Sequence, residues 1–194
     1  MYYFLDVENI KYAKVTLFLI FINVFCYITF NLVLTDDFIH FIQINRNIIE
    51  DHEIWRIFTP IFIHIDFIHL FSNMIGLLLF GATIENSRVY SKIEYVFIYF
   101  VSGLIGNLFS LILLPLDSIS LGASGAIFGL IGATFVMIVT EDRSLLLLAL
   151  MYILFFIVSS LAPEINLWAH LFGLLGGVFL GYIFKPKDTD LEHY

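Results

Sequence analysis

Six long apolar runs, separated by short polar breaks, constrain this chain more than any other feature of its sequence. Each run holds about 20 residues, the length that an α-helix needs to cross the hydrocarbon core of a bilayer. We therefore expect six membrane spans, at about 13–35, 61–83, 94–115, 121–139, 144–162 and 166–184. The composition agrees, because 60% of the residues are hydrophobic and 13% are charged, against about 25% charged in soluble domains. The predicted fold class is an all-α membrane protein, a six-helix bundle.

The chain shows no internal boundary. No Pro- or Ser-rich linker, repeat or low-complexity segment interrupts it, so residues 1–194 are predicted to form a single membrane domain. The first residues, MYYFLDVENI, lack the basic segment and cleavage site of a signal peptide, so the first run is expected to stay in the protein. Cys26 is the only cysteine, which excludes a disulfide within the chain and disfavours a cysteine metal cluster. The net charge of −8 does not favour nucleic acid as a partner.

Lys and Arg are spread unevenly over the predicted loops. Cytoplasmic loops of membrane proteins are enriched in these residues, and a cytoplasmic N-terminus leaves only Arg46 and Arg56 outside. The inner residues would then be Lys11, Lys14, Arg88, Lys92, Arg143, Lys185 and Lys187. We predict cytoplasmic N- and C-termini, since six spans return the chain to its starting side. The long loop between the first two runs mixes apolar and acidic residues and is predicted to lie partly embedded at the outer interface.

A serine between small residues opens the fourth run. In the stretch SLGASGAIFG, Ser124 comes where the helix is expected to begin, near the predicted external face. Backbone N–H groups at a helix N-terminus have no helical acceptor and can bind an anion, which is compatible with a reactive serine. The four-residue spacing of Gly125, Gly129 and Ala133 is also typical of close helix packing. On this stretch alone, packing is the favoured interpretation.

His170 lies in the sixth run, four residues after Asn166. At about 1.5 Å per residue it is about 6 Å inside the helix from the external side, the depth expected for Ser124. Gly173 and Gly177 share its face, which another helix must approach closely. A single intramembrane histidine is most often a buried imidazole bonded to a neighbouring carbonyl, and for His170 by itself that interpretation is favoured.

The second run adds further polar side chains. The sequence FIHIDFIHLFSN places His69 and Asn73 one helical turn apart, on one face near the external end. Such donors can stabilise negative charge on a substrate oxygen, and His64, just before the turn, is expected to shape the entrance. The alternatives are interhelical hydrogen bonding for Asn73 and an interfacial position for His64. Polar groups from three spans at one depth favour a joint site over three separate packing roles.

Together these residues resemble the rhomboid intramembrane serine proteases, and the resemblance runs over nearly the whole chain. The matching residues are Trp55, Arg56, His64, His69, Asn73, Glu85, the GxSG residues Gly122, Ser124 and Gly125, and the AHxxGxxxG residues Ala169, His170, Gly173 and Gly177. Each motif alone has modest specificity. Together, in this order along the expected spans, the motifs strongly resemble a minimal six-helix rhomboid.

The resemblance implies a serine endopeptidase with a catalytic dyad. Ser124 would be the nucleophile, and His170 would act first as general base and then as general acid. The resemblance also implies that the Ser124 backbone N–H group and the side chains of His69 and Asn73 hold the oxyanion. No cofactor and no metal ion are expected.

One position departs from the family pattern. Phe128 stands four residues after Ser124, where bacterial members often carry a tyrosine packed against the histidine. Phenylalanine can still stack but contributes no hydroxyl group, so Phe128 is assigned to packing. No aspartate lies near the sixth run, so no third catalytic residue that would complete a triad is expected. Glu164 is expected to be a solvated charge.

Peptide hydrolysis needs water, which the hydrocarbon core lacks, so the site is expected in a polar cavity open to the external side. The expected partners are the lipid bilayer and single-span membrane proteins, cut near their external boundary where a helix unwinds easily. The fifth helix or the loop after Pro115 is expected to move to admit them. The expected location is the cytoplasmic membrane of a prokaryote. Substrate identity and oligomeric state are not predicted.

Two other functions stay open. A catalytically silent relative would bind client helices, although retention of both Ser124 and His170 disfavours it. A bis-histidine haem or metal carrier would use His69 and His170, but no further suitable ligands are well placed. A metalloprotease is disfavoured because HExxH does not occur. An aspartyl intramembrane protease needs paired aspartates within the spans, and only Asp66 lies near one.

Overall fold

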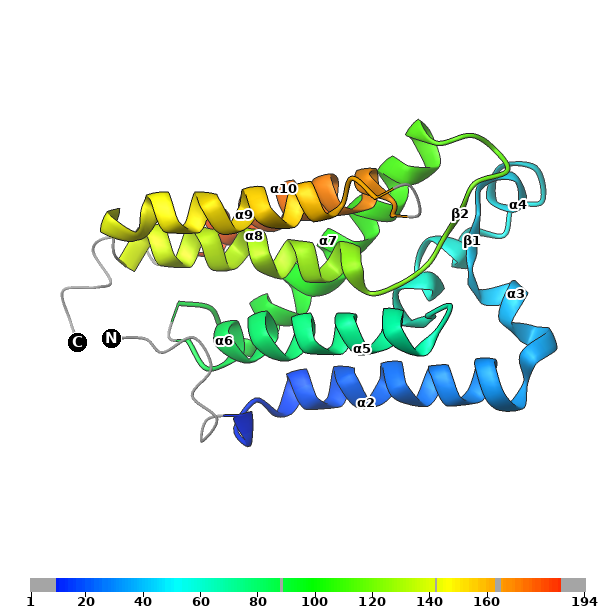
Figure 1. Cartoon of the computed structure of the whole chain (residues 1–194), viewed down its shortest axis with the longest axis horizontal. Helices are drawn as coiled ribbons and strands as arrows, with labels where there is room; N and C mark the ends of the chain where they lie inside the picture. The colour runs from blue at the N-terminus through cyan, green and yellow to red at the C-terminus, as the bar shows by residue number, and fades with distance from the viewer. Residues whose placement is uncertain (1–9, 88, 142, 163–164, 186–194) are drawn as a thin grey trace.

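The computed structural model describes residues 10–87, 89–141, 143–162 and 165–185. The long helices run roughly along one direction, with α7 tilted across them (Figure 1). Their bounds are Lys14–Ile28 for α2, Phe67–Gly76 for α5, Lys92–Leu113 for α7, Ser124–Glu141 for α8, Leu146–Ser159 for α9 and Leu167–Phe184 for α10. The short elements are α3 (Phe38–Phe41), β1 (Gln43–Ile44), α4 (Asn45–Glu50), α6 (Ala82–Glu85) and β2 (Ile119–Ser120). Helix α2 begins and α10 ends on one side of the bundle, and residues 34–66 gather at the other, which we call the loop end.

The predicted all-α membrane bundle is confirmed. Four segments are long and apolar enough to span a membrane, namely Lys14–Val33, Phe67–Glu85, Lys92–Leu113 and Leu167–Phe184. Two further apolar helices, Ser124–Thr140 and Arg143–Ser159, are shorter. The first two spans reach their length through π-helical turns at Thr29–Val33 and Leu77–Gly81. Arg88, Glu164 and Lys187, which the sequence analysis used, lie outside the described residues.

The second span begins later than predicted, at Phe67 rather than at 61. Residues Thr59–Phe62 form a separate 3₁₀ turn with Pro60 as its second residue. The helix starts where Asp66 can cap it, since its side chain accepts a hydrogen bond of 2.7 Å from the backbone N–H of His69. His64 is therefore a loop residue that precedes the membrane helix.

Glycine brings α8 and α10 into backbone contact. A Cβ atom on Gly173 would overlap the carbonyl oxygen of Gly125, and a Cβ atom on Gly177 would overlap that of Gly129. The hydrophobic effect does not drive helices together in lipid, so association depends on close packing of this kind. The glycine spacing recognised in the sequence thus forms the seam between the fourth and sixth spans.

The end of the second span is tied to the start of the first. The buried carboxylate of Glu85 accepts hydrogen bonds from the backbone N–H groups of Val15 and Thr16, at 2.9 and 2.8 Å. It also accepts one of 2.9 Å from the Thr16 hydroxyl, and Lys92 Nζ lies 3.5 Å away. A carboxylate on free N–H groups at a helix N-terminus is favourable, so Glu85 serves as a cap for α2.

The loop end is ordered around the buried Arg56, which is 2% exposed. Its guanidinium group donates to the carbonyl oxygens of Ile39 and Ile42, at 2.6 and 2.8 Å, and pairs with Glu53. The hydrogen bond from Arg56 lowers the pKa of Glu53. Antiparallel pairing of β1 with β2 joins this loop to the segment before α8, with Gln43 opposite Ser120.

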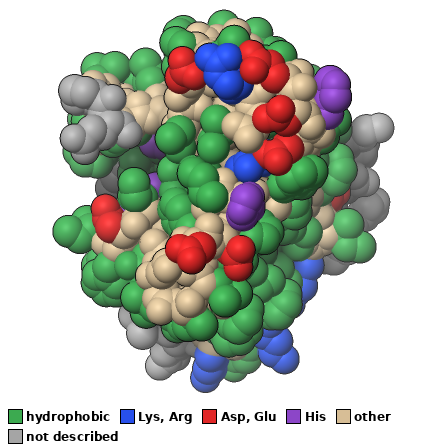
Figure 2. Space-filling view, turned by 90° about the vertical axis from the view of Figure 1, so that its right-hand side faces the viewer, with side chains coloured by type: hydrophobic (Ala, Val, Ile, Leu, Met, Phe, Trp, Pro, Cys, Tyr) green, Lys and Arg blue, Asp and Glu red, His purple; other side chains and the backbone are tan. Residues whose placement is uncertain are grey.

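Acidic side chains are prominent on the surface of the loop end, where they lie among hydrophobic ones (Figure 2). The exposed acidic residues of this region are Asp36, Asp37, Glu50, Asp51, Asp66 and Asp117. Arg46 pairs with two of them, at 2.8 Å from Glu50 and 2.9 Å from Asp117. The mixture of apolar and charged side chains follows the amphipathic pattern of the sequence, and placement of this loop at the membrane interface stays a prediction.

The seam between α8 and α10 predicts a large effect of one methyl group. Gly177→Ala would force the two backbones apart, at about 1–3 kcal/mol for overpacking, and should lower the thermal midpoint in detergent by about 5 °C. Gly76→Ala is the matched control, because its Cβ would meet only side-chain atoms of Ile127, the nearest at 3.1 Å. Equal midpoints for the two variants would show that the seam does not limit stability.

Candidate active site

Ser124 is the first residue of α8, and a constrained loop sets its position. Gly122 has φ 117°, a backbone region that side chains disfavour, and its N–H group donates to the Pro60 carbonyl oxygen at 2.9 Å. The N–H group of Ala123 points to His64 Nε2 at 3.4 Å. The N–H group of Ser124 belongs to the first helical turn and therefore has no helical acceptor. A half-buried hydroxyl thus stands beside a free backbone donor.

His69 and Asn73 lie against the loop that precedes Ser124. A Cβ atom on Gly122 would lie 2.8 Å from both Cε1 and Nε2 of His69 and 3.9 Å from Asn73 Nδ2. The two side chains share a face of α5, as their spacing predicts. Asn73 Nδ2 donates one hydrogen to the His69 carbonyl oxygen at 2.9 Å; its second hydrogen remains for another acceptor. Glycine at position 122 leaves room for the His69 ring, which a Cβ atom would overlap.

His170 is buried on α10, at 8% exposure, with its ring stacked on Phe128. The ring centroids are 4.1 Å apart and the planes differ by 15°. Because Phe128 follows Ser124 by one turn of α8, the imidazole lies along the helix that carries the serine. Among the described residues, Ser124 and His170 share no hydrogen bond, a contact that often forms only when substrate is bound. The Nδ1 atom of His170 instead lies 2.7 Å from the Ser160 hydroxyl oxygen.

The sequence predicts that His64 shapes the entrance of the site. Its side chain is 0% exposed, so it supports the loop instead. Its ring meets that of His69 edge-on, with centroids 5.1 Å apart. Burial, and secondarily the nearby His69, lower the pKa of His64 to about 3. A neutral ring whose Nε2 accepts from the Ala123 N–H group carries its proton on Nδ1. His64 thereby holds the backbone next to Ser124.

The remaining motif residues fall into two groups. The first group consists of glycines at which another segment packs closely, around Ser124 and His170: Gly122, Gly125, Gly173 and Gly177. The second group lies away from Ser124 and His170. The indole Nε1 of Trp55 donates to the His40 carbonyl oxygen at 3.1 Å. Arg56 orders the loop end, and Glu85 caps α2. These three residues contribute to the framework of the bundle.

Asn166 and Ser160 were not selected as site residues from the sequence. Asn166 caps α10 by accepting from the Ala169 N–H group at 3.0 Å, and its amide donates to Ser110 and Ser120 hydroxyls, both at 2.8 Å. An asparagine directly before an apolar run is a cap signal that could have revealed this role. For Ser160, the only sequence signal is a pair of serines that closes the fifth run.

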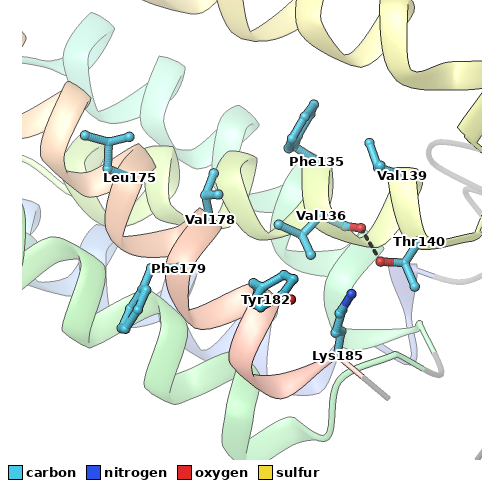
Figure 3. A pocket seen from close by; sticks show the side chains of 9 residues that line it. All are labelled: Phe135, Val136, Val139, Thr140, Leu175, Val178, Phe179, Tyr182 and Lys185. Atoms are coloured by element: carbon cyan, nitrogen blue, oxygen red, sulfur yellow. Dashed lines mark hydrogen bonds between the residues drawn. The ribbon is translucent and has the colours of Figure 1, made fainter. Parts of the chain in front are cut away.

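An apolar groove of about 470 Å³ lies away from these residues. Figure 3 shows it between α8 and α10, toward the C-terminal ends of both helices, with Lys185 at one edge. None of the predicted site residues lines it. Among the described residues, no group of three or more His, Cys, Asp or Glu side chains is arranged to hold a metal ion.

Comparison with known proteins places the motifs in a family. A family model described as Rhomboid domain matches residues 51–187. YdcA of Bacillus subtilis (strain 168), provisionally named a rhomboid protease, is 36% identical over 141 residues, which cover 70% of this chain and 69% of YdcA. RHOMBOID-like protein 1 of Arabidopsis thaliana is 34% identical over 143 residues, covering 71% of this chain and 36% of the plant protein.

Rhomboid protease GluP of Bacillus subtilis (strain 168) is 31% identical over 150 residues, which cover 75% of this chain and 29% of GluP. This chain therefore matches about a third of the length of GluP and of the Arabidopsis protein.

The buried His64 predicts a loss of stability in acid. Its pKa of about 3 in the folded chain lies below the 6.5 of an unperturbed histidine, so the unfolded state binds the proton more readily and stability falls as pH drops from 6.5 towards 3. By pH 4.5 this amounts to about 2–3 kcal/mol. His64→Gln, which keeps an acceptor for Ala123 N–H, should lose less stability over that interval. Parallel thermal midpoints of the two proteins from pH 7 to pH 4.5 would contradict the assignment.

Proposed function

The chain belongs to the rhomboid family, and from that premise we propose that it is an intramembrane serine endopeptidase in which Ser124 and His170 form a catalytic dyad. The observation that carries the proposal is the position of Ser124 at the N-terminus of α8, with the donors of His69 and Asn73 against the adjoining Gly122. A serine hydroxyl, a histidine base and oxyanion donors are the parts that peptide hydrolysis by acyl transfer requires.

In the proposed reaction, Ser124 Oγ attacks the carbonyl carbon of the scissile peptide while His170 takes the hydroxyl proton. The negative charge that develops on the carbonyl oxygen is held by the Ser124 N–H group, by His69 Nε2–H and by the free N–H of Asn73. His170 then protonates the leaving amine, which frees the C-terminal fragment and leaves an acyl-serine. Water, deprotonated by His170, hydrolyses the ester and restores Ser124.

Two supports orient these groups. The stack on Phe128 fixes the plane of the His170 ring without a tyrosine hydroxyl. Contact between Gly173 and the Gly125 carbonyl brings the histidine helix against the serine helix. Because these supports are backbone and ring contacts within the bundle, the site is largely formed before substrate arrives, which reduces the reorganisation needed during the reaction.

We propose that substrates are single-span membrane proteins that approach from the bilayer and are cut near their external boundary. The proposed site lies toward the loop end, where the polar and acidic residues provide a hydrated surface. The distribution of Lys and Arg supports an external position of this end and cytoplasmic termini. A prokaryotic cytoplasmic membrane is the proposed location.

Labelling with a fluorophosphonate serine probe in detergent tests the dyad. The wild-type chain should become labelled, and Ser124→Ala and His170→Ala should each abolish labelling, because the hydroxyl reacts only with its base in place. Ser118→Ala, a serine in the loop before β2, serves as the control that keeps the label.

A folded wild-type chain that never reacts would instead favour a client-binding relative or a haem carrier. An absorption spectrum of the purified protein separates these two, since haem bound by His69 and His170 would give a Soret band. Labelling that survives Ser124→Ala would place the nucleophile elsewhere.

Gly122→Ala tests the arrangement of the oxyanion donors. Its Cβ would require a strained φ and would overlap the His69 ring, so His69 should be displaced and the labelling rate should fall by about 10²-fold, the size of one lost oxyanion donor. Gly76→Ala, on the same helix as His69 and Asn73, should keep the wild-type rate. A folded Gly122→Ala variant that reacts at the wild-type rate would show that His69 does not stabilise the oxyanion.

A further inference from the structure

One contact of His170 has no part in the reaction as written above. The hydroxyl oxygen of Ser160 lies 2.7 Å from His170 Nδ1, and Ser160 is 1% exposed at the C-terminal cap of α9. We propose that Ser160 is a positioning residue that holds His170 in the tautomer with its proton on Nδ1. The inference rests on the proposed role of His170 as the base.

The direction of this hydrogen bond follows from the single proton of a hydroxyl group. Ser160 Oγ also lies 2.8 Å from the Phe156 carbonyl oxygen, one turn earlier in α9, and donates to it. A carbonyl oxygen can only accept, and we assign the single Ser160 proton to that bond. Toward His170, the serine oxygen is then an acceptor, and the proton between the two residues belongs to Nδ1.

The tautomer decides which ring nitrogen can act as base. A neutral imidazole has one N–H group, so a proton on Nδ1 leaves the lone pair on Nε2. This nitrogen is at the opposite side of the ring from Ser160 and is free to take the Ser124 proton. With the opposite tautomer Nε2 would carry hydrogen and could not serve as the base until the ring exchanged its proton.

Two contacts from different helices therefore fix the imidazole in complementary ways. The stack on Phe128 of α8 sets the plane of the ring, and the bond to Ser160 of α9 sets its rotation within that plane. Among the described residues, no carboxylate bonds to His170, and Glu164 lies outside them. The neutral serine oxygen takes the place that a carboxylate occupies in a three-membered site, and it also accepts from the imidazolium that forms in the reaction.

Nitrogen-15 NMR of histidine-labelled protein in detergent reads the tautomer directly, with His170→Asn to assign the signals. At a pH where the ring is neutral, the wild-type spectrum should show a protonated Nδ1 and an unprotonated Nε2 for His170. Ser160→Ala should give a mixture of tautomers, and Ser160→Thr, which keeps the hydroxyl, should restore the wild-type pattern. Ser159→Ala is the matched control, because Ser159 also donates to the Phe156 carbonyl oxygen, at 2.7 Å, but is exposed.

The rate of fluorophosphonate labelling provides the second readout. Ser160→Ala should react about 10-fold more slowly, a part of the 10²–10⁴ that a positioned general base contributes. Ser160→Thr should recover most of that rate, and Ser159→Ala should equal the wild type. A structural role for the hydroxyl would lower the thermal midpoint without changing the tautomer.

A proton on Nε2 in wild-type His170 would overturn the proposal whatever the rates, and this measurement needs no variant at position 160. An unchanged tautomer and rate in Ser160→Ala would also overturn it. A wild-type chain that shows the Nδ1 proton but no labelling would contradict the proposed protease function. It would still support the proposal that Ser160 fixes the tautomer of His170.

Discussion

Backbone contact between α8 and α10 is the interaction on which the rest of the structure depends. Gly173 and Gly177 meet the carbonyl oxygens of Gly125 and Gly129, and any side chain at those positions would collide with these oxygens and push the helices apart. Since the proposed nucleophile and base stand on these two helices, one or two ångströms of separation would remove the geometry that acyl transfer requires. In this protein the packing that stabilises the bundle also aligns the proposed dyad.

Several buried polar side chains in the bundle bond to backbone atoms at the ends of helices. Glu85 binds the first N–H groups of α2, Asn166 caps α10, and Arg56 binds the carbonyl oxygens of the loop around α3. Unsatisfied backbone groups are costly in a bilayer, and side chains that satisfy them at helix ends leave the helix faces free to pack. At the proposed site, His64 does the same by binding the N–H group of Ala123, just before α8.

Features that depend on length and local spacing could be predicted from the sequence. The spans follow from apolar runs of sufficient length, and the shared face of His69 and Asn73 follows from a separation of four residues. The second span begins later than its apolar run predicts, because the loop before Phe67 is held to the segment before α8 through Pro60 and His64. The cap of Asn166 has a local signal, but the bonds of Asn166 to Ser110 and Ser120 and of Ser160 to His170 join different elements of the structure. No periodicity could identify these partners.

The π-helical turn at Leu77–Gly81 divides the second span into two helical parts whose side chains face in independently set directions. A π turn contains one more residue than an α turn, and each added residue rotates the following face by about 100°. The upstream face presents His69 and Asn73 to the loop before Ser124, whereas the downstream face presents Glu85 to the start of α2. A regular α-helix would couple these two orientations, so that optimising one would turn the other away. The extra residue uncouples them, and a single span can meet the geometric demands of the proposed chemistry at one end and of anchoring at the other.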